Sequence, residues 1–332
     1  MKKMNMTRLF TTYRKPLWAG FFIVLVAFVL TFPLYGGRYP TSVLTTMLVY
    51  AILAVSWTMF SGTTGYMSLA PAAFFGTGIY VMALLQDYLP FPAIMAVAGL
   101  ISFALAALLG LVTLRLKGIY FTIFSFGLVV FIGNVVNYVE AALFHRHGWV
   151  FNLVDRTTLL YIMFGLAVVT VLAAYFIGRS RLGLAMRSIG GNEEAAEHMG
   201  IDTTRTKILT FAISAVFMGA AGVVVAPSLS YSNAGIAFSV IYSFIPIVAA
   251  LFGGMGQLSG PIVGALVYGY LEKTLKIEFL DYFQLGFGVI IVVVILFLPG
   301  GIVGLVPMLR NRLGRMILKL RKGSGAEQHG NT

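Results

Sequence analysis

The longest polar run in this otherwise apolar chain is Arg181–Leu209. Asn192 is a good helix N-cap, the glutamates after it lie where the helix dipole favours anions, and Gly200 suits the left-handed residue that follows a helix end. The pattern predicts a short helix of about two turns with small alanine side chains. Such a helix favours contact with a partner protein, and a plain connecting loop is the alternative. The residues expected at that contact are Arg187, Asn192, Glu193, Glu194, Ala195, Ala196 and Gly200.

Elsewhere, the sequence contains no pattern of residues that is typical of a catalytic site or a metal site. His145 and His147 lack a third metal-binding side chain close by, so solvated loop residues are the better interpretation. The glycine-rich stretch 253–260 lacks the lysine and the Ser/Thr of a Walker A loop, and it indicates a tight turn before a helix start. The residues of this turn are Gly253, Gly254, Gly256, Gly260 and Pro261. We therefore expect no catalytic residues, no metal and no cofactor bound by this chain.

The composition places the chain in a lipid bilayer. Hydrophobic residues make up 59% of the 332 residues and charged residues 10%, and runs of about 20 apolar residues recur. The formal net charge is +12. The basic residues gather near the two ends and in the segment 179–207, as the positive-inside rule describes for cytoplasmic segments. We therefore expect no nucleic-acid partner. The chain has no cysteine, which excludes disulfides and thiolate metal sites.

Hydropathy predicts an all-α membrane protein, a bundle of about ten transmembrane helices. Six spans precede the segment 179–207, so that segment and both termini are expected in the cytoplasm. The count treats the glycine-rich stretch as a turn between two short spans. We expect a cytoplasmic tail at 1–16, one transmembrane domain at 17–304 and a basic cytoplasmic tail at 305–332. The predicted spans are about 17–35, 42–60, 68–86, 92–114, 118–138, 159–178, 206–226, 238–253, 261–275 and 283–298.

The stretch Gly62–Tyr80 combines glycine, proline and other small residues within the membrane region. Two interpretations stay open. The small residues could let helices pack closely, or a broken helix start could point into a translocation path, since irregular backbone is tolerated there. Tyr120 lies near a predicted membrane interface, where aromatic anchors are common. The residues considered for such a path are Tyr66, Ser68, Ala72, Tyr120 and Thr122.

Glu194, Ala195 and Ala196 followed by Gly200 reproduce the EAA-x-x-x-G pattern of the coupling helix in ABC-importer permeases. With three further blocks, the chain resembles the permeases of branched-chain amino acid ABC importers over about residues 40–304. The blocks are GYMSLAPAAFFGTGIY (65–80), LKGIYFTIFSF (116–126) and GGMGQLSGPIVGALVYGYLE (253–272), with the region 198–226 continuing the coupling segment. The second block separates LivM-type subunits, which this chain resembles, from LivH-type subunits.

The resemblance implies a permease subunit, not itself an enzyme, that moves leucine, isoleucine and valine into the cell by alternating access. ATP and Mg²⁺ would bind to two cytoplasmic ABC ATPase subunits docked on the coupling helices. The partner permease would be a LivH-type subunit or another copy of this chain, and an extracytoplasmic solute-binding protein would deliver the solute. The expected location is the inner membrane of a bacterium or archaeon, where the basic tail favours contact with anionic lipid.

Other functions stay open on the sequence alone. The stretch GGNEEAA at 190–196 looks more like sugar permeases of the same superfamily, and urea, short amides or aromatic amino acids are further alternative solutes. A secondary transporter working without ATP would commonly keep a carboxylate at mid-membrane. Asp87, Glu140 and Asp155 fall outside the predicted spans, and no carboxylate is expected at mid-membrane. This pattern favours transport driven by another subunit.

Overall fold

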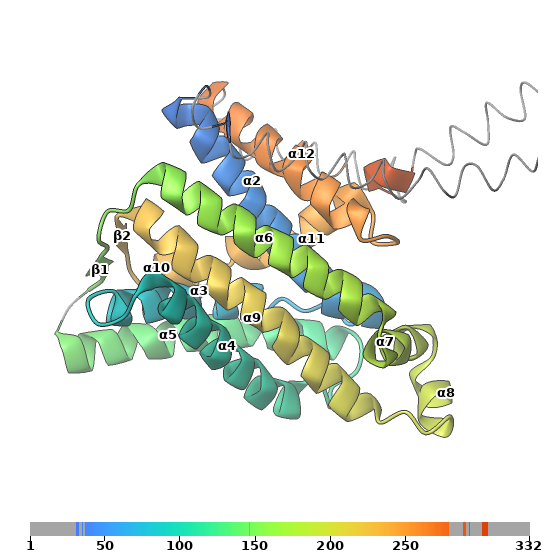
Figure 1. The fold of residues 1–332 in the computed structure, drawn as a ribbon. Coiled ribbons are helices and arrows are strands. Elements are labelled where there is room, and N and C mark those ends of the chain that lie inside the picture. Colours follow the sequence, from blue (N-terminus) through green and yellow to red (C-terminus); the bar gives the residue numbers. More distant parts are fainter. Residues whose placement is uncertain are drawn as a thin grey trace, which may run out of the picture.

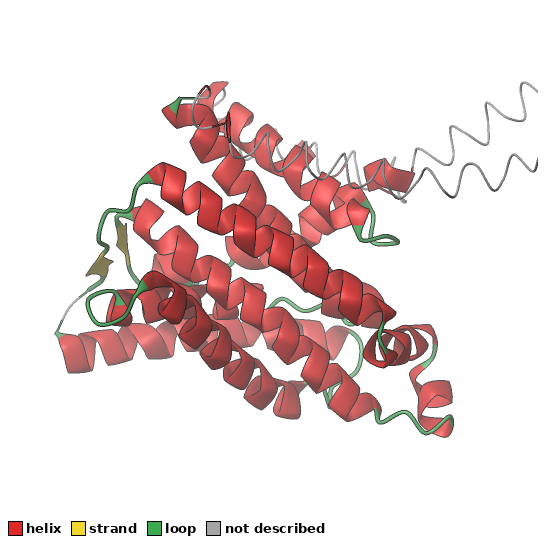
Figure 2. Ribbon diagram, in the orientation of Figure 1, coloured by secondary structure: helices red, strands yellow, loops and turns green. Residues whose placement is uncertain are grey.

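The structure is a computed structural model that describes residues 31–32, 35, 37–145, 147–278, 288–289, 292 and 301–304. The described residues are mainly helical and include one pair of two-residue strands (Figure 2). The elements are α2 (Arg38–Trp57), the π-helical turn η1 (Thr58–Gly62), α3 (Pro71–Leu85), α4 (Phe91–Thr113), α5 (Ile119–Phe144), β1 (Trp149–Val150), α6 (Arg156–Arg179), α7 (Arg181–Gly191), α8 (Glu193–His198), α9 (Thr203–Leu229), β2 (Tyr231–Ser232), α10 (Ala234–Ala237), α11 (Ile241–Gly253) and α12 (Ser259–Glu278).

Several helices are long and apolar enough to cross a bilayer, which makes the chain a multi-pass, all-α membrane protein. Each is about as long as the roughly 20 residues that a span requires. α3 is apolar as well but has only 15 residues. The predicted spans 17–35 and 283–298 and both predicted tails lie largely outside the described residues. Within those residues the six candidate spans are Tyr39–Gly62, Phe91–Thr113, Ile119–Phe144, Arg156–Arg179, Thr203–Leu229 and Ala234–Gly253.

The core is built around α9, which runs between α6 and α4 (Figure 1). Small residues bring its backbone against its neighbours, because a Cβ on Gly78 of α3 would lie 1.9 Å from the carbonyl oxygen of Gly219. Likewise, a Cβ on Gly222 would lie 2.1 Å from the carbonyl oxygen of Phe75. Glycine at these positions lets the helices approach closely. By contrast, α5 leaves most of its surface exposed.

The glycine-rich stretch forms the predicted turn between two separate helices. α11 ends at Gly253, Gly254 adopts a positive φ of 97°, and α12 begins at Ser259. A Cβ on Gly253 would lie 1.7 Å from the carbonyl oxygen of Gly260, so the two helices touch through their backbones. Pro261 lies in the first turn of α12, where its missing N–H costs nothing. Gly256 stands in open space within the turn.

The two ends of the bundle carry different structures (Figure 1). At one end, α7 and α8 form a small helical platform, which we call the α8 end. At the other end, β1 pairs antiparallel with β2, with Trp149 opposite Ser232 and Val150 opposite Tyr231. We call this the strand end. The sequence predicts one polar connecting segment where the structure forms α7 as a separate helix of 11 residues. It did not predict the strand pair, because strands of two residues are too short to give a periodic signal.

Candidate functional site

The α8 helix has the boundaries that its sequence predicts. The Asn192 side chain accepts a hydrogen bond from the backbone N–H of Ala195 at 3.0 Å, and so caps the helix start. At the other end, Gly200 adopts a φ of 84° and its N–H donates to the carbonyl of Glu197. α7 is capped in the same way by Ser180. Two capped helices in succession therefore hold α8 at a fixed place on the bundle.

The structure divides the predicted contact residues of α8 into two faces. Asn192, Glu194, Ala195 and Gly200 are exposed, so their surfaces can meet a partner. Ala196 is completely buried and Glu193 is half-buried, so these two side chains contact the chain's own bundle and do not present themselves outward. Arg187 is exposed on α7, where its guanidinium donates to the carbonyls of Gly178 and Gly183.

Glu193 connects α8 to two other parts of the bundle. Its Oε1 accepts from Lys207 Nζ of α9 at 2.6 Å, and its Oε2 accepts from the Tyr66 hydroxyl at 2.5 Å. Lys207 Nζ also lies 3.4 Å from the Tyr66 hydroxyl oxygen and 4.7 Å from the centre of its ring. The backbone carbonyl of Leu114 at the end of α4 is a further acceptor for Lys207, at 3.4 Å. We call Tyr66, Glu193 and Lys207 the coupling triad.

The protonation states of Glu193 and Tyr66 are determined by burial and by the residues that contact them. Burial raises the pKa of Glu193, but the hydrogen bonds from Lys207 and Tyr66 and the positive charge of Lys207 outweigh it, so the net pKa lies below the usual value of 4.5. Burial, together with the hydrogen bond to Glu193, raises the pKa of Tyr66 above its usual value. The carboxylate is therefore ionised and the phenol protonated at neutral pH, as the donor and acceptor roles require.

Lys207 is the functional residue that sequence reasoning missed. It is 2% exposed, and a buried ammonium is costly unless it is paired and hydrogen-bonded. A signal was present in the sequence, because Lys207 lies near the start of a predicted span and is followed by the apolar residues Ile208 and Leu209. A basic residue at the end of a span is usually attributed to the positive-inside rule, which does not predict a partner for Lys207 inside the protein.

Tyr66 belongs to the segment 63–70, which separates η1 from α3 and is irregular from Gly65 onward. Side chains of distant helices satisfy its backbone: Trp57 Nε1 donates to the carbonyl of Ser68 at 2.9 Å, and Ser125 Oγ accepts from the N–H of Leu69 at 2.9 Å. Ser243 Oγ donates to the carbonyl of Leu69 at 2.7 Å and accepts from the N–H of Ala72 at 3.1 Å. Broken backbone at membrane depth requires such partners.

The residues considered for a translocation path have different surroundings in the structure. Ser68 and Ala72 are buried by packing, and the space beside Ser68, between Trp57 and Phe211, has no room for a water molecule. Tyr120 is 70% exposed on α5, and Thr122 donates to the carbonyl of Met67. In this structure the stretch serves close packing, and a path role for these residues stays a prediction.

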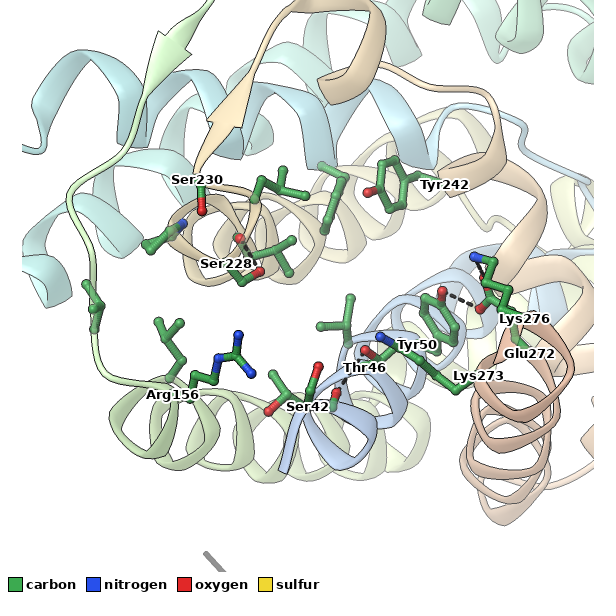
Figure 3. A pocket seen from close by; sticks show the side chains of 18 of the residues that line it. Ser42, Thr46, Tyr50, Arg156, Ser228, Ser230, Tyr242, Glu272, Lys273 and Lys276 are labelled. Atoms are coloured by element: carbon green, nitrogen blue, oxygen red, sulfur yellow. Dashed lines mark hydrogen bonds and ion pairs between the residues drawn. The ribbon is translucent and has the colours of Figure 1, made fainter. Parts of the chain in front are cut away.

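Glu140 falls outside the predicted span 118–138, but the structure places it within a longer candidate span. α5 continues to Phe144, so Glu140 lies within this helix, 2% exposed, and accepts from the Tyr80 hydroxyl at 2.7 Å. Glu272 also lies within a predicted span and is 5% exposed on α12. It accepts from the Tyr50 hydroxyl at 2.5 Å and pairs with Lys276 (Figure 3). Both carboxylates lie nearer the strand end of their helices than the α8 end.

Comparison with known proteins matches residues 39–299 to the family described as "Branched-chain amino acid transport system / permease component". The permease protein LivM of the high-affinity branched-chain amino acid transport system of Salmonella typhimurium is 27% identical, covering 91% of this chain and 77% of the relative. The LivH permease protein of Escherichia coli is 25% identical over 77% of this chain and 91% of the relative. The ribose import permease RbsC of Haemophilus influenzae is 29% identical over only 36% of this chain.

Proposed function

The chain belongs to the family of permease components of branched-chain amino acid transport systems, and from that premise we propose that it is the membrane subunit of an ATP-driven importer for leucine, isoleucine and valine. ATP and Mg²⁺ bind to separate ATPase subunits in this proposal, and the chain itself catalyses no reaction. Family membership is the stronger reason to favour this function over an ion-coupled carrier, because two carboxylates, Glu140 and Glu272, are buried in the bundle, although both lie toward the strand end.

The observation that carries the coupling role is the attachment of α8 to the bundle. Its exposed face, with Glu194, Ala195 and Gly200, is available to an ATPase, while its inner face is joined to α9 and to the segment 63–70 by the coupling triad. A displacement of α8 therefore pulls on two elements at once. One is the central helix of the core, and the other is the broken segment that is held by hydrogen bonds to α2, α5 and α11.

Alternating access follows from this arrangement. ATP binding closes the ATPase pair and moves the docked α8, and Glu193 transmits that movement to Lys207 and Tyr66. Packed interfaces respond to such a movement by switching between two arrangements, because they are not continuously deformable. ATP supplies the differential contacts that favour one arrangement over the other. The segment 63–70 is suited to move, since beyond Gly65 side chains from α2, α5 and α11 hold its backbone.

The proposed assembly has two permease subunits, this chain and a LivH-type partner or a second copy, with two ATPases at the α8 end. This end faces the cytoplasm and the strand end faces outward, where a solute-binding protein delivers the solute. The location is the inner membrane of a bacterial or archaeal cell. In support, the relatives that cover most of this chain are permease proteins of branched-chain amino acid transport systems.

A sugar is the second candidate solute, since the ribose import permease is similar over part of the chain. Calorimetry with the co-encoded binding protein separates the two, using leucine, isoleucine, valine, phenylalanine, urea and ribose as ligands. Tight binding of a branched-chain amino acid supports the proposal. Binding of ribose, urea or phenylalanine alone overturns the proposed solute and leaves the importer mechanism standing.

A further inference from the structure

A cavity of about 490 Å³ opens at the strand end of the bundle, away from the coupling triad. It lies among α2, α6, the end of α9, α11 and α12, and its lining includes the Tyr50–Glu272–Lys276 group (Figure 3). Its polar residues lie near helix ends: Arg156 is the first residue of α6 and Ser42 lies in the first two turns of α2. Because α2 and α6 are candidate spans, this level of the bundle corresponds to a membrane interface.

The cavity carries an excess of positive charge. Among the described residues that line it, Glu272 is the one carboxylate, and both of its oxygens are engaged, one by Tyr50 and the other by Lys276. Arg156 and Lys273 have no ion pair or hydrogen bond from their side chains within the described part of the chain. The nearby Asp155 lies outside the lining, and its carboxylate caps α6. Two positive charges in the cavity are therefore left without a counter-charge among the described residues.

The walls between these cations are apolar. Val49, Leu159 and Val225 line the cavity together with hydroxyl-bearing side chains such as Ser42. Figure 3 shows Arg156 extending from α6 into the space toward Ser42, and Lys273 extending from α12 toward α2. A matching ligand has an anionic group for the two cations and a hydrocarbon part for the walls. A zwitterionic amino acid fits poorly, because its ammonium group would find no unengaged carboxylate among the described residues of the lining.

We propose that this cavity binds the phosphate group of an anionic membrane lipid, held between Arg156 and Lys273, with an acyl chain against the apolar wall. Basic pockets between transmembrane helices recognise anionic lipid head groups, because their cations pair with the phosphate. In the proposed topology the lipid belongs to the outer leaflet. The bound lipid would join α6 to α12, which are far apart in sequence, and so would stabilise the bundle.

The test uses the complete purified importer with its partner subunits. Wild type and the variant Arg156→Gln/Lys273→Gln are titrated with phosphatidylglycerol in nanodiscs, and bound lipid is counted by native mass spectrometry. The variant is expected to bind roughly 25-fold more weakly, from the usual contribution of two cations near a membrane surface. Arg156→Lys/Lys273→Arg keeps both charges and should bind within about threefold of wild type. Arg181→Gln at the α8 end should leave binding unchanged.

Thermal unfolding of the same samples identifies the ligand. Phosphatidylglycerol should raise the Tm of wild type and not that of the Gln variant, whereas phosphatidylcholine and inorganic phosphate should raise neither. Equal lipid binding by wild type and the Gln variant overturns the site. Stabilisation by inorganic phosphate without lipid overturns the lipid assignment, and stabilisation by leucine that the Gln variant loses assigns the cavity to the solute instead. The results with lipid and with inorganic phosphate do not depend on which solute the importer carries.

Discussion

Lys207 Nζ lies 2.6 Å from Glu193 Oε1, and this ion pair ties α8 to the central helix of the bundle. The two side chains are 3% and 15% exposed. A second ion pair joins Asp202 and Arg205 at the start of the same helix, α9, with its atoms 3.0 Å apart, but these side chains are 53% and 89% exposed. The two ion pairs lie in one region and differ in burial, so they provide a matched comparison.

Replacing Lys207 by Met should destabilise the folded permease by about 3 kcal/mol, because it leaves the Glu193 carboxylate buried with only Tyr66 as partner. Arg205→Met removes an exposed pair and should cost less than about 1 kcal/mol. Chemical denaturation of the purified protein in detergent measures both changes. A cost for Lys207→Met no larger than that for Arg205→Met would mean that the buried pair does not hold α8.

The contribution of Glu193 should depend on pH. Its pKa is lower in the folded protein than its usual value of 4.5, so the folded state favours the ionised form. The resulting stabilisation is fully present above about pH 5 and is lost as the pH falls through the folded pKa, below 4.5. The difference in Tm between wild type and Glu193→Gln should therefore be constant from pH 6 to pH 8 and shrink below pH 4.5. A difference that grows on acidification would contradict the assigned pairing.

Gly78→Ala should destabilise the bundle by at least about 3 kcal/mol, since overpacking forces backbones apart. The added methyl group would lie 1.9 Å from the carbonyl oxygen of Gly219, and backbone cannot rotate away. Gly165→Ala on α6 is the control, because nothing lies within 4 Å of its Cβ position. Size-exclusion profiles and Tm values of the two variants should differ clearly, with Gly165→Ala equal to or above wild type. Equal behaviour of the two variants would argue against the contact between α3 and α9.

Ser243→Ala should loosen the segment 63–70. Its hydroxyl serves both the N–H of Ala72 and the carbonyl of Leu69, and leaving such groups unsatisfied costs about 2 kcal/mol. Hydrogen exchange at the Ala72 amide should then be roughly thirtyfold faster. Ser228→Ala, whose hydroxyl bonds only within α9, should leave this exchange unchanged. Unchanged exchange in Ser243→Ala would mean that other contacts hold the segment.

The two faces of α8 should respond differently to a bulky residue. Ala195→Trp alters the exposed face, so it should weaken binding of the ATPase at least tenfold while changing the Tm of the isolated permease by little. Ala196→Trp places a large ring in a site with no exposed surface, so it should lower that Tm. Co-purification with the ATPase and thermal unfolding of the permease alone separate the two effects. If Ala195→Trp binds the ATPase as wild type does, the outer face of α8 is not the docking surface.

Much of the fold followed from local signals. The apolar runs predicted the six candidate spans of the described residues, the glycines at 253–260 predicted the turn between two helices, and Asn192 with Gly200 predicted α8. Each of these features depends on residues that are close together in the chain, so it can be recognised in a single sequence. The docking role of α8 is a different matter and stays a prediction.

The triad could not be predicted in the same way. Tyr66, Glu193 and Lys207 are separated by 127 and 14 residues along the chain, and only the packing of α9 against the segment before α3 brings them together. Sequence reasoning placed Tyr66 in the path and Glu193 at the ATPase, whereas the structure bonds them to each other. Sequence reasoning also placed the carboxylate Glu140 outside the spans, because α5 extends several residues beyond its most apolar part.

The measurement that tests the account most directly is leucine uptake into proteoliposomes that contain the complete importer, with ATP hydrolysis followed in the same sample. We predict uptake that requires ATP and the binding protein, and a Lys207→Met variant that still hydrolyses ATP but imports far less leucine per ATP. Arg205→Met should keep the wild-type ratio. Leucine uptake without ATP would contradict the importer assignment, and an unchanged ratio in Lys207→Met would contradict coupling through the triad.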